Sequence, residues 1–565
     1  MPSVLDTVLN RVAQYAEEHP RSRVAQRGVQ RCKEFERVDA LPRRHWDNGE
    51  VYELVQALTA ILRVPNGAQT LRPIQAIALY EIAEMRGAIG TIRVGAGKTL
   101  VSFLAPRVLG CNRPLLIIPA KLKRKTKREL VLCAAHWRIA GNLSIISYEW
   151  LGRVQAVEYL NRLAPDCIIL DEAHKIRNLK AAVTRRLNRY CTTKGPATIA
   201  MSGTLVRSKL LDWAHIGNWA LGEGSPAPRK WNTIAHWGNS LDLEAKLPPG
   251  ALSKWDTGHG HRSGYQQRVN DTPGVVATID GLLGVALEIE AFEVAVPREI
   301  QEALKDLDDW ILPDGFIITD PLAHARAERQ LALGCYYRWV EPPPLLWAAK
   351  RSDWSRFVRH AVRYLKPNGN PLDSELHVAQ HCANGALDDR AYKAWKEIKP
   401  SFKPVIEHVW MSDEIVQALI GRAKKNSAIV WIESVAVGER MHSLGLRYCG
   451  RQGLTADGEY IEDMRGPICA SIASNSEGRN LQFQWSHAIV SCPMKDAVVW
   501  EQMIGRIHRE GQTKDEVSID VLFTCENHRR AWKRALIHAA YLETINGQPQ
   551  KLLQATIIEG TEANE

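Results

Sequence analysis

The sequence contains no apolar run long enough to cross a bilayer. Its N-terminus also lacks a continuous apolar core, because residues 5–12 place their apolar side chains at helical spacing among polar ones. Internal repeats and low-complexity tracts are missing as well. We therefore expect a cytoplasmic protein that has no membrane partner.

Paired cysteines are missing too, although the chain has 11 cysteines. None belongs to a Cys-x-x-Cys motif, and several, such as Cys167 and Cys469, lie in apolar runs typical of strands. This pattern favours reduced cysteines in protein cores over disulfide bonds. His259 and His261 stand in a Gly-rich stretch without neighbouring cysteines, so we expect no zinc site there.

The length and composition are those of an ordinary multidomain protein. A chain of 565 residues predicts two or more domains. Its 45% hydrophobic and 24% charged residues are typical of a soluble globular protein. The net charge of +10 favours a polyanionic partner, and nucleic acid rather than a membrane surface.

The stretch around Lys98 predicts a phosphate-binding loop. A short apolar run at 88–92 is expected to form a strand, and an apolar stripe that begins at Leu100 is expected to form a helix. Between them, glycines let the backbone approach phosphates, a lysine reaches the β- and γ-phosphates, and a hydroxyl ligates Mg²⁺. The residues in these positions are Gly95, Ala96, Gly97, Lys98 and Thr99. Ile92 stands where the full eight-residue pattern has a glycine.

Gln75 lies upstream of this loop, shortly after Pro73 and at the start of a helical run. Its side-chain amide offers both a donor and an acceptor, so it can recognise the edge of an adenine base. A glutamine after a proline is otherwise a common helix-start residue. The position of Gln75 before the loop favours the nucleotide-binding interpretation.

Two strand ends downstream of the loop carry polar residues. The strand candidate at 167–170 runs directly into Asp171 and Glu172. Asp171 is expected to hold Mg²⁺ through water, and Glu172 is expected to orient and deprotonate an attacking water. The next strand candidate, at 197–201, ends at the same predicted edge in Ser202, Gly203 and Thr204.

A run with six basic residues among eight starts shortly after the strand candidate at 115–118. Open α/β sheets bind ligands at the carboxyl ends of their strands, so contact with nucleic-acid phosphates is favoured over a merely solvated helix face. These basic residues are Lys121, Lys123, Arg124, Lys125, Lys127 and Arg128. A second basic stretch, at 21–37, follows an amphipathic helix expected at 1–20, and a solvated face is the simpler interpretation there.

The middle of the chain, at 223–400, shows no clear alternation of strands and helices. Helical runs are expected near 298–310 and 320–335. A Trp-rich stretch at 339–354 also contains arginines, and such aromatic rings can stack nucleic-acid bases. Core packing of these tryptophans is the favoured interpretation.

Strand-like and helix-like runs alternate again in the last third of the chain. The strand candidates are 428–432, 467–472, 487–490 and 517–523. Gln502, Arg506 and Arg509 fall at positions i, i+4 and i+7, which predicts that they share one helix face. Two arginines aimed at one point suit a γ-phosphate, because guanidinium is a planar fork that stabilises phosphoryl charge. A surface helix with salt bridges is the alternative.

Together these motifs resemble those of superfamily-two helicases, most closely the Swi/Snf-like DNA translocases of a stand-alone phage or bacterial type. The pattern Gln-x-x-Gly-Arg-x-x-Arg-x-Gly-Gln is the discriminating one, because DEAD-box RNA helicases begin this motif with His-Arg. The resemblance covers about 66–210 and 426–525 and rests on Gln75, Gly95–Thr99, Asp171–His174, Ser202–Thr204, Gly478–Leu481 and Gln502–Gln512. The chain departs from the family pattern at 92–94, and at Ser202, where threonine is commoner.

The resemblance implies an α/β fold, in which two RecA-like P-loop domains with parallel sheets flank a mainly helical insertion. The expected divisions are a basic helical segment at 1–65, an ATP-binding lobe at 66–222, the insertion at 223–400, and a second lobe with C-terminal helices at 401–565. ATP and Mg²⁺ are the implied cofactors, held between the lobes. Nucleic acid would lie across both lobes, and lobe closure would link hydrolysis to movement.

The resemblance also implies roles for individual residues. Arg509 would be the arginine finger, with Arg506 in support, and both would act on ATP held by the loop that contains Lys98. Residues that couple the nucleotide state to lobe closure would be His174, Ser202, Gly203, Thr204, Gly478, Asn480 and Gln502.

The function implied by the resemblance is that of an ATP-dependent DNA translocase or helicase, a DNA-stimulated ATPase acting in replication, recombination or repair. Its expected partners are duplex or forked DNA and possible replication or repair proteins, in the cytoplasm of a bacterial or phage-infected host cell. Three alternatives stay open: an RNA helicase, an ATP-gated nucleic-acid clamp, and the motor subunit of a restriction or defence complex.

Overall fold

The chain forms two compact units. A computed structural model describes residues 28–92, 96–153, 155–179, 181–203, 208–278, 285–318, 321–341, 343–367, 372, 375–403 and 405–558. Unit 1 comprises the described residues up to 278 together with 540–549, and unit 2 comprises those from 285 to 539 together with 550–558. The division therefore falls between 278 and 285, and does not coincide with the expected boundaries at 222 and 400. The helix expected at 1–20 lies outside the described residues.

Unit 1 is built on a parallel sheet of six strands. The strands are β1 (Ala88–Thr91), β2 (Pro114–Ile118), β3 (Ser144–Ser147), β4 (Cys167–Asp171), β5 (Ala197–Ser202) and β6 (Val275–Ala277). They lie in the order β3-β2-β4-β5-β1-β6, and every neighbouring pair is parallel. The sequence correctly predicts four of them, from the apolar runs at 88–92, 115–118, 167–170 and 197–201.

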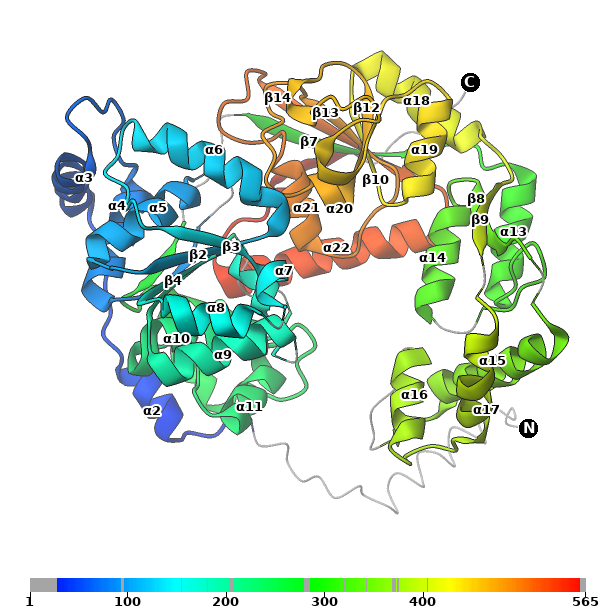
Figure 1. The fold of residues 1–565 in the computed structure, drawn as a ribbon, viewed down its shortest axis with the longest axis horizontal. Coiled ribbons are helices and arrows are strands. Elements are labelled where there is room, and N and C mark those ends of the chain that lie inside the picture. Colours follow the sequence, from blue (N-terminus) through cyan, green and yellow to red (C-terminus); the bar gives the residue numbers. More distant parts are fainter. Residues whose placement is uncertain are drawn as a thin grey trace, which may run out of the picture. The chain divides into compact units, whose positions relative to one another are not determined.

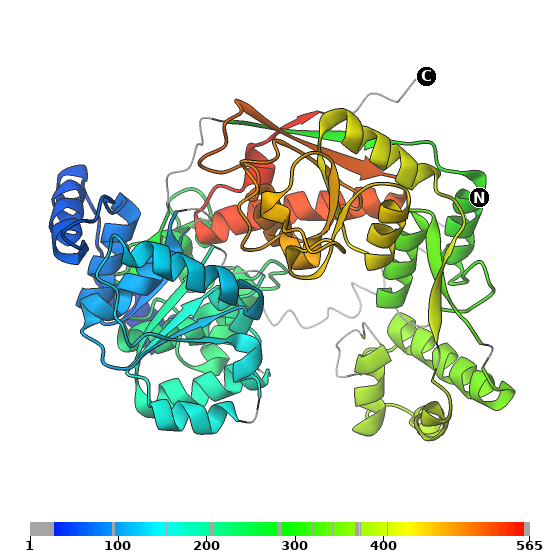
Figure 2. The same ribbon diagram turned by 45° about the horizontal axis from the view of Figure 1, so that its top comes forward.

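Helices cover both faces of this sheet. They are α2 (Lys33–Ala40), α3 (Asn48–Leu62), α4 (Pro73–Met85), α5 (Lys98–Leu109), α6 (Lys123–Ala134), α7 (Tyr148–Leu151), α8 (Ala156–Leu163), α9 (Ala182–Lys194), α10 (Leu211–Leu221), α11 (Trp231–Leu241) and α12 (His261–Asn270). Figure 1 shows α5 and α6 on one face and α8, α9 and α10 on the other, and Figure 2 shows the same layers after a turn of 45°. The larger apolar core lies on the α5 face, where Leu79, Phe103 and Ile169 are completely buried.

Unit 2 is built on a parallel sheet of seven strands. The strands are β7 (Ala286–Glu293), β10 (Ile429–Ile432), β11 (Tyr448–Cys449), β12 (Ile468–Ser471), β13 (His487–Val490), β14 (Glu516–Phe523) and β15 (Thr556–Ile558). Their order is β11-β12-β10-β13-β14-β7-β15, again with parallel pairs throughout. A separate antiparallel pair joins β8 (Cys335–Trp339) to β9 (Ile406–Trp410). The four strands predicted after residue 427 are β10, β12, β13 and β14, so an α/β fold with parallel sheets is confirmed.

The helices of unit 2 lie partly beside the seven-stranded sheet and partly in a group away from it (Figure 1). They are α13 (Arg298–Asp308), α14 (Pro321–Leu331), α15 (Leu345–Tyr364), α16 (Glu375–Ala383), α17 (Arg390–Ile398), α18 (Glu414–Asn426), α19 (Val435–Ser443), α20 (Ile472–Asn475), α21 (Ala497–Ile504), α22 (Glu526–Asn546) and α23 (Lys551–Gln554). The last seven residues of α22 belong to unit 1. The helical runs predicted near 298–310 and 320–335 correspond to α13 and α14.

The middle of the chain contributes to both sheets. β6 pairs with β1 in unit 1, and β7 pairs with β14 over eight residues in unit 2. In β7 the side chains of Leu287 and Ile289 are buried two residues apart, as in a strand that has one face in a core, and Phe292 on the other face is buried as well. The expected insertion at 223–400 is thus rich in helices, but it also supplies a strand to each sheet.

The tryptophans of the middle segment pack in a core. Trp347 and Trp354 are 3% and 1% exposed and lie in an apolar cluster with Trp395. This confirms the preference for core packing over base stacking at these two positions. The side chain of Trp339 lies outside the described residues.

The cysteines are reduced, as the sequence predicts. All 11 cysteines are free, and seven of them are buried. Within the described parts of the chain, no helix has the length and apolar character that a membrane span needs.

Candidate functional site

The carboxyl ends of three neighbouring strands of unit 1 bring the predicted site residues to one edge of the sheet. β5 lies between β4 and β1, so that Met201 is in register with both Asp171 and Gly90. Ser202 is one residue further along, opposite Thr91. The Asp-Glu pair after β4, the polar end of β5 and the loop after β1 therefore share an edge, as the sequence predicts.

The loop after β1 is described from Ala96 onwards, and the predicted Gly95 lies outside the described residues. Gly97 has a φ of +83°, which is costly for residues that carry a Cβ. A Cβ on Gly97 would also overlap the side-chain amide of Gln75. Glycine is therefore required at this position by its backbone and by its neighbour.

Gln75 is held in place from both sides of its amide. It lies in the first turn of α4, where Pro73 takes a position at which proline costs no hydrogen bond. Its Oε1 accepts a hydrogen bond from the main-chain N of Arg72 at 2.9 Å, and its Nε2 donates to the carbonyl O of Gly97 at 3.3 Å. The predicted base-reading glutamine thus contacts the phosphate-loop candidate directly.

Lys98 points its ammonium back across the loop. The residue is only 8% exposed, and its Nζ donates to the carbonyl O of Ile92 at 2.8 Å. Lys98 and Thr99 are the first two residues of α5, and Thr99 is half-buried. The helix N-terminus, a buried cation and a hydroxyl are thus collected at the sheet edge, and this combination suits an anion.

Asp171 ends β4 in a buried environment. Its exposed fraction is 8%, and the main-chain N of Glu172 donates to its Oδ1 at 3.1 Å. The hydroxyl of Tyr148 donates to its carbonyl O at 2.8 Å. Burial and the charge of Glu172 raise the pKa of Asp171 to about 7, and the Lys98 charge opposes this shift. This electrostatic link relates the lysine of the loop to the carboxylate of β4.

Glu172 and His174 connect β4 to β5. The backbone of Glu172 has a φ of +55°, a strained conformation for a residue with a Cβ. Nδ1 of His174 lies 3.1 Å from Oγ of Ser202 and 3.3 Å from Oε2 of Glu172. Ser202 is followed by Gly203, whereas the predicted Thr204 lies outside the described residues. His174 therefore contacts two of the other predicted catalytic and coupling residues, Glu172 and Ser202.

The arginines predicted for the site belong to unit 2, where one prediction about them is wrong. α21 ends at Ile504, so Gln502 lies in the helix but Arg506 and Arg509 lie in the turns that follow it. A shared helix face does not hold these three side chains together. Their assignment as site residues stays a prediction.

The two arginines are instead attached to the segment 478–481. Nη1 of Arg506 donates to the carbonyl O of Arg479 at 2.9 Å, and Nη1 of Arg509 reaches the same oxygen at 3.4 Å. Nη1 of Arg509 also donates to Oδ1 of Asn480 at 2.8 Å. Gly478, with a φ of +75°, begins this segment in a backbone conformation that favours glycine. Two motifs that are separate in the sequence thus form one structural unit.

The predicted basic run lies on a short 3₁₀ turn (Ala120–Leu122) and the first half of α6. Within it Thr126 is buried, so this turn of the helix packs against unit 1. The ammonium of Lys125 lies 3.7 Å from the carboxylate of Glu129, so part of its charge is balanced by an ion pair within the helix. The exposed cations of the run are Lys123, Arg124, Lys127 and Arg128.

Sequence reasoning missed several residues that hold this site. Arg479 lies in a recognised motif, but its guanidinium contacts with Tyr460 and Gln452 have no local sequence signal. Gln548 donates through Nε2 to the carbonyl O of Thr91, the last residue of β1. That contact joins positions 457 residues apart. Only the folded chain shows it.

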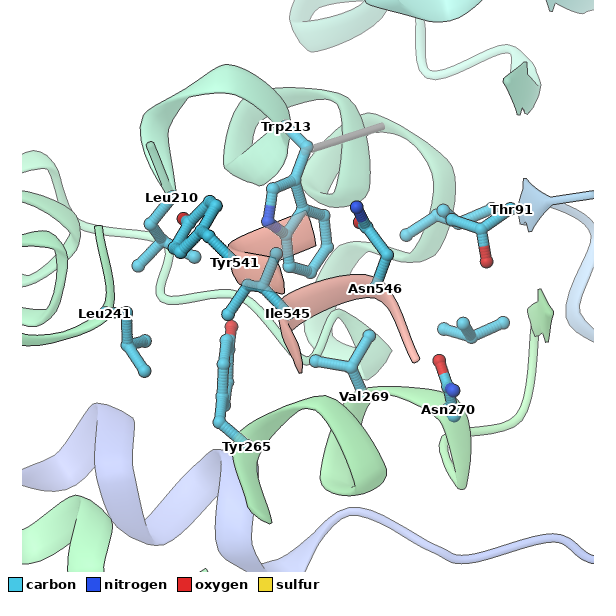
Figure 3. Close-up of a pocket in the computed structure, with 12 residues that line it drawn as sticks. Thr91, Leu210, Trp213, Leu241, Tyr265, Val269, Asn270, Tyr541, Ile545 and Asn546 are labelled. Atoms are coloured by element: carbon cyan, nitrogen blue, oxygen red, sulfur yellow. The ribbon is translucent and has the colours of Figure 1, made fainter. Parts of the chain in front are cut away.

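The segment that contains Gln548 closes a small apolar cavity beside β1. Figure 3 shows Tyr541, Ile545 and Asn546 of this segment gathered with Trp213 and Thr91 around the cavity. Its volume is about 30 Å³, the size that one water molecule needs. The cavity is therefore a small gap in side-chain packing beside β1, and it is too small for a nucleotide.

The described residues contain no group of three or more His, Cys, Asp or Glu side chains that could hold a metal by itself. A single carboxylate and a hydroxyl can still serve a Mg²⁺ ion that takes its other ligands from phosphates and water. Asp171 and Thr99 are the residues that fit this description. Comparison with protein-family models and with curated proteins finds no match to the chain.

Proposed function

We propose that the protein is an ATP-dependent DNA translocase or helicase, a DNA-stimulated ATPase that acts in replication, recombination or repair. One arrangement carries the proposal: Lys98, the Asp171–Glu172 pair and the His174–Ser202 contact share one edge of the parallel sheet in unit 1. Parallel α/β sheets bind ligands at this edge. The motif resemblance is the reason for proposing ATP as the nucleotide and DNA as the polymer.

ATP with Mg²⁺ fits the donor set at this edge. Gly97 supplies the left-handed backbone conformation that begins α5, and the buried ammonium of Lys98 offers a charge for phosphate oxygens. Thr99 and Asp171 are the expected magnesium ligands, of which Asp171 would act through water. Bound Mg²⁺ would neutralise phosphate charge and polarise the phosphoryl group.

The remaining residues have roles in orientation and proton transfer. Glu172 would orient the attacking water and accept its proton. His174, in contact with both Glu172 and Ser202, would relay the position of this carboxylate to the end of β5. By the motif resemblance, Arg509 would stabilise phosphoryl charge, and Arg506 would support it.

DNA is the proposed polymer. The exposed cations of α6 would contact the phosphate backbone, since the helix starts just beyond the carboxyl end of β2. The net charge of +10 supports a polyanionic partner. The sequence of the 502–512 motif favours DNA over RNA.

The decisive experiment is the steady-state ATPase activity of the wild type and of Glu172→Gln. Each is measured without nucleic acid and with duplex DNA, forked DNA, single-stranded DNA or RNA. We expect strong stimulation by DNA, and Glu172→Gln should lower the rate by about 10²–10⁴-fold, the usual contribution of a general base. Lys98→Ala should abolish turnover. The control, Glu158→Gln, removes an exposed carboxylate from α8 and should leave the rate unchanged.

The outcomes separate the alternatives. Turnover that RNA stimulates more than DNA would identify an RNA helicase, and ATP retention without turnover in saturating DNA would identify an ATP-gated clamp. Absence of stimulation by every polymer would refute the motor proposal. Arg509→Ala should lower turnover while ATP binding is retained, and a normal rate in this variant would refute its role as the arginine finger.

A further inference from the structure

A groove between α8 and α9 in unit 1 carries a cluster of cations that the proposed site does not use. The groove has a volume of about 410 Å³. Val157, Leu160 and Tyr190 contribute apolar surface to it, and Arg185, Arg189 and Lys194 line it as well. Its size lies within the range of ligand-binding pockets.

The charge of α9 and of the segment that precedes it is of one sign. From Lys175 to Lys194 the sequence has seven basic residues and no acidic one. Arg185, Arg189 and Lys194 are exposed, and among the described residues no carboxylate lies within ion-pair distance of any of them. A helix that merely faced solvent would gain from i,i+4 pairs of opposite charge, whereas Arg185 and Arg189 form a repulsive pair of like charge.

Arg186, in the same helix, has a structural role that Arg185 and Arg189 lack. Its Nη1 donates to the carbonyl oxygens of Leu151 and Arg153, so its charge is satisfied by the main chain that precedes α8. Lys194 also has a structural reason to be basic, because it is the last residue of α9 and faces the negative end of the helix dipole. Neither explanation applies to Arg185 and Arg189.

The spacing of the cations suits an extended polyanion. Arg185 and Arg189 are one helical turn apart, about 6 Å along the axis, and Lys194 lies about 7.5 Å further along. One strand of B-DNA presents a phosphate about every 3.4 Å of helix axis, so these charges span about four phosphates. Val157 is exposed and offers apolar contact for sugars, whereas Tyr190 is largely buried and its hydroxyl donates to the carbonyl O of Pro165 at 3.1 Å.

We propose that the α8–α9 groove binds the sugar–phosphate backbone of a second nucleic-acid segment. α6, with the predicted primary contacts, and α9 lie on opposite faces of the sheet (Figure 1). A single straight segment of nucleic acid cannot contact α6 and the α8–α9 groove at the same time. The ligand of the groove is therefore a second segment, such as one arm of a fork. This inference rests on the proposed function for the class of its ligand.

The test is the binding of labelled forked DNA, duplex DNA, single-stranded DNA and RNA by fluorescence anisotropy, as a function of salt. The variant Arg185→Ala/Arg189→Ala removes two phosphate contacts and should lower the slope of log K against log [salt] by about 1.8 on forked DNA. Its affinity for the fork should fall at least about tenfold near 0.1 M salt, with a smaller change on the duplex. The matched control, Lys424→Ala/Lys425→Ala, removes two exposed charges from α18 in unit 2 and should change neither quantity.

A second measurement keeps folding separate from binding. The thermal midpoint and ATP binding of the arginine variant should equal those of the wild type, because both side chains are exposed. If the variant keeps the wild-type slope and affinity on forked DNA, the groove assignment is wrong and the proposed function stands. If the wild type binds none of the polymers, the motor proposal fails. Binding of an acidic protein in place of nucleic acid, lost in the arginine variant, would also overturn the inference.

Discussion

Replacing Gly97 with alanine should impose two separable costs on unit 1. The first is the backbone, since a φ of +83° places an alanine in the left-handed region. The second is steric, because the new Cβ would overlap Nε2 of Gln75 and come within 3.2 Å of its Cδ. Gln75 is itself anchored in the first turn of α4, so it cannot move away freely.

The magnitude of each cost can be estimated. A non-glycine residue in the left-handed region costs about 1–2 kcal/mol. Displacing Gln75 breaks its bonds with Arg72 N and Gly97 O, at about 0.5–1.5 kcal/mol each. Gly97→Ala should therefore lower the free energy of unfolding by about 2–5 kcal/mol.

Gly110 provides a matched control for the backbone cost. It follows the other end of α5 with a φ of +66°, and a Cβ there would meet no atom within 4 Å. Gly110→Ala should thus show the backbone cost alone, about 1–2 kcal/mol. The difference between the two alanine variants isolates the contact with Gln75.

The assay is urea unfolding in the absence of nucleotide, followed by far-ultraviolet circular dichroism. Gln75→Ala by itself removes the same two hydrogen bonds, so adding it to Gly97→Ala should cost little more, and the two changes should be non-additive by about 1–3 kcal/mol. Equal effects of Gly97→Ala and Gly110→Ala, together with additivity of the Gln75 change, would refute the reasoning. The backbone of Gly97 would then be the whole reason for the glycine.

Three further predictions concern stability. Burial raises the pKa of Asp242 to about 6. The free energy of unfolding of the wild type is therefore highest below about pH 4 and declines as the pH rises through 6. Asp242→Asn should remove this decline in pH-dependent urea unfolding, which amounts to about 1–2 kcal/mol after allowance for partial exposure. Burial and the Arg329 charge lower the pKa of His528 to about 4. The free energy of unfolding therefore falls by at most about 3 kcal/mol as the pH drops from about 6.5 to 4. His528→Gln should make the free energy of unfolding independent of this group over the same pH range, in the same urea assay. Gln548→Ala should cost about 1 kcal/mol and speed hydrogen exchange at the end of β1, because Thr91 loses one of its donors.

The sequence predicts the strands that are locally bounded and strongly apolar. The runs that become β4 and β10 are short, buried on both faces and followed by polar residues, which is the pattern of central parallel strands. β7 was missed although Leu287 and Ile289 alternate with Glu288 and Glu290. Its partner β14 begins more than 200 residues later, so no nearby strand–helix repeat marks it as part of a sheet.

Some features of the candidate site could be predicted from the sequence, and others could not. Residues at strand ends, such as Asp171 and Ser202, could be placed at one edge from the sequence, because parallel strands end together. The direction of Lys98 toward Ile92, and the contact between Gln75 and Gly97, depend on how α4 and α5 pack against each other. Such contacts are set by tertiary structure, which spacing along the chain does not encode.

The end of α21 shows why periodicity misplaced the two arginines. In a continuing helix the main-chain N of Arg506 would donate to the carbonyl O of Gln502. Instead it donates to Met503 O at 3.0 Å, and the Arg506 side chain takes Gln502 O through Nε at 2.8 Å. The arginine thus caps its own helix, and its Nη1 continues to Arg479 O, the acceptor that Arg509 also reaches. The carbonyl O of Arg479 therefore contacts both guanidinium groups and relates their positions to the segment 478–481.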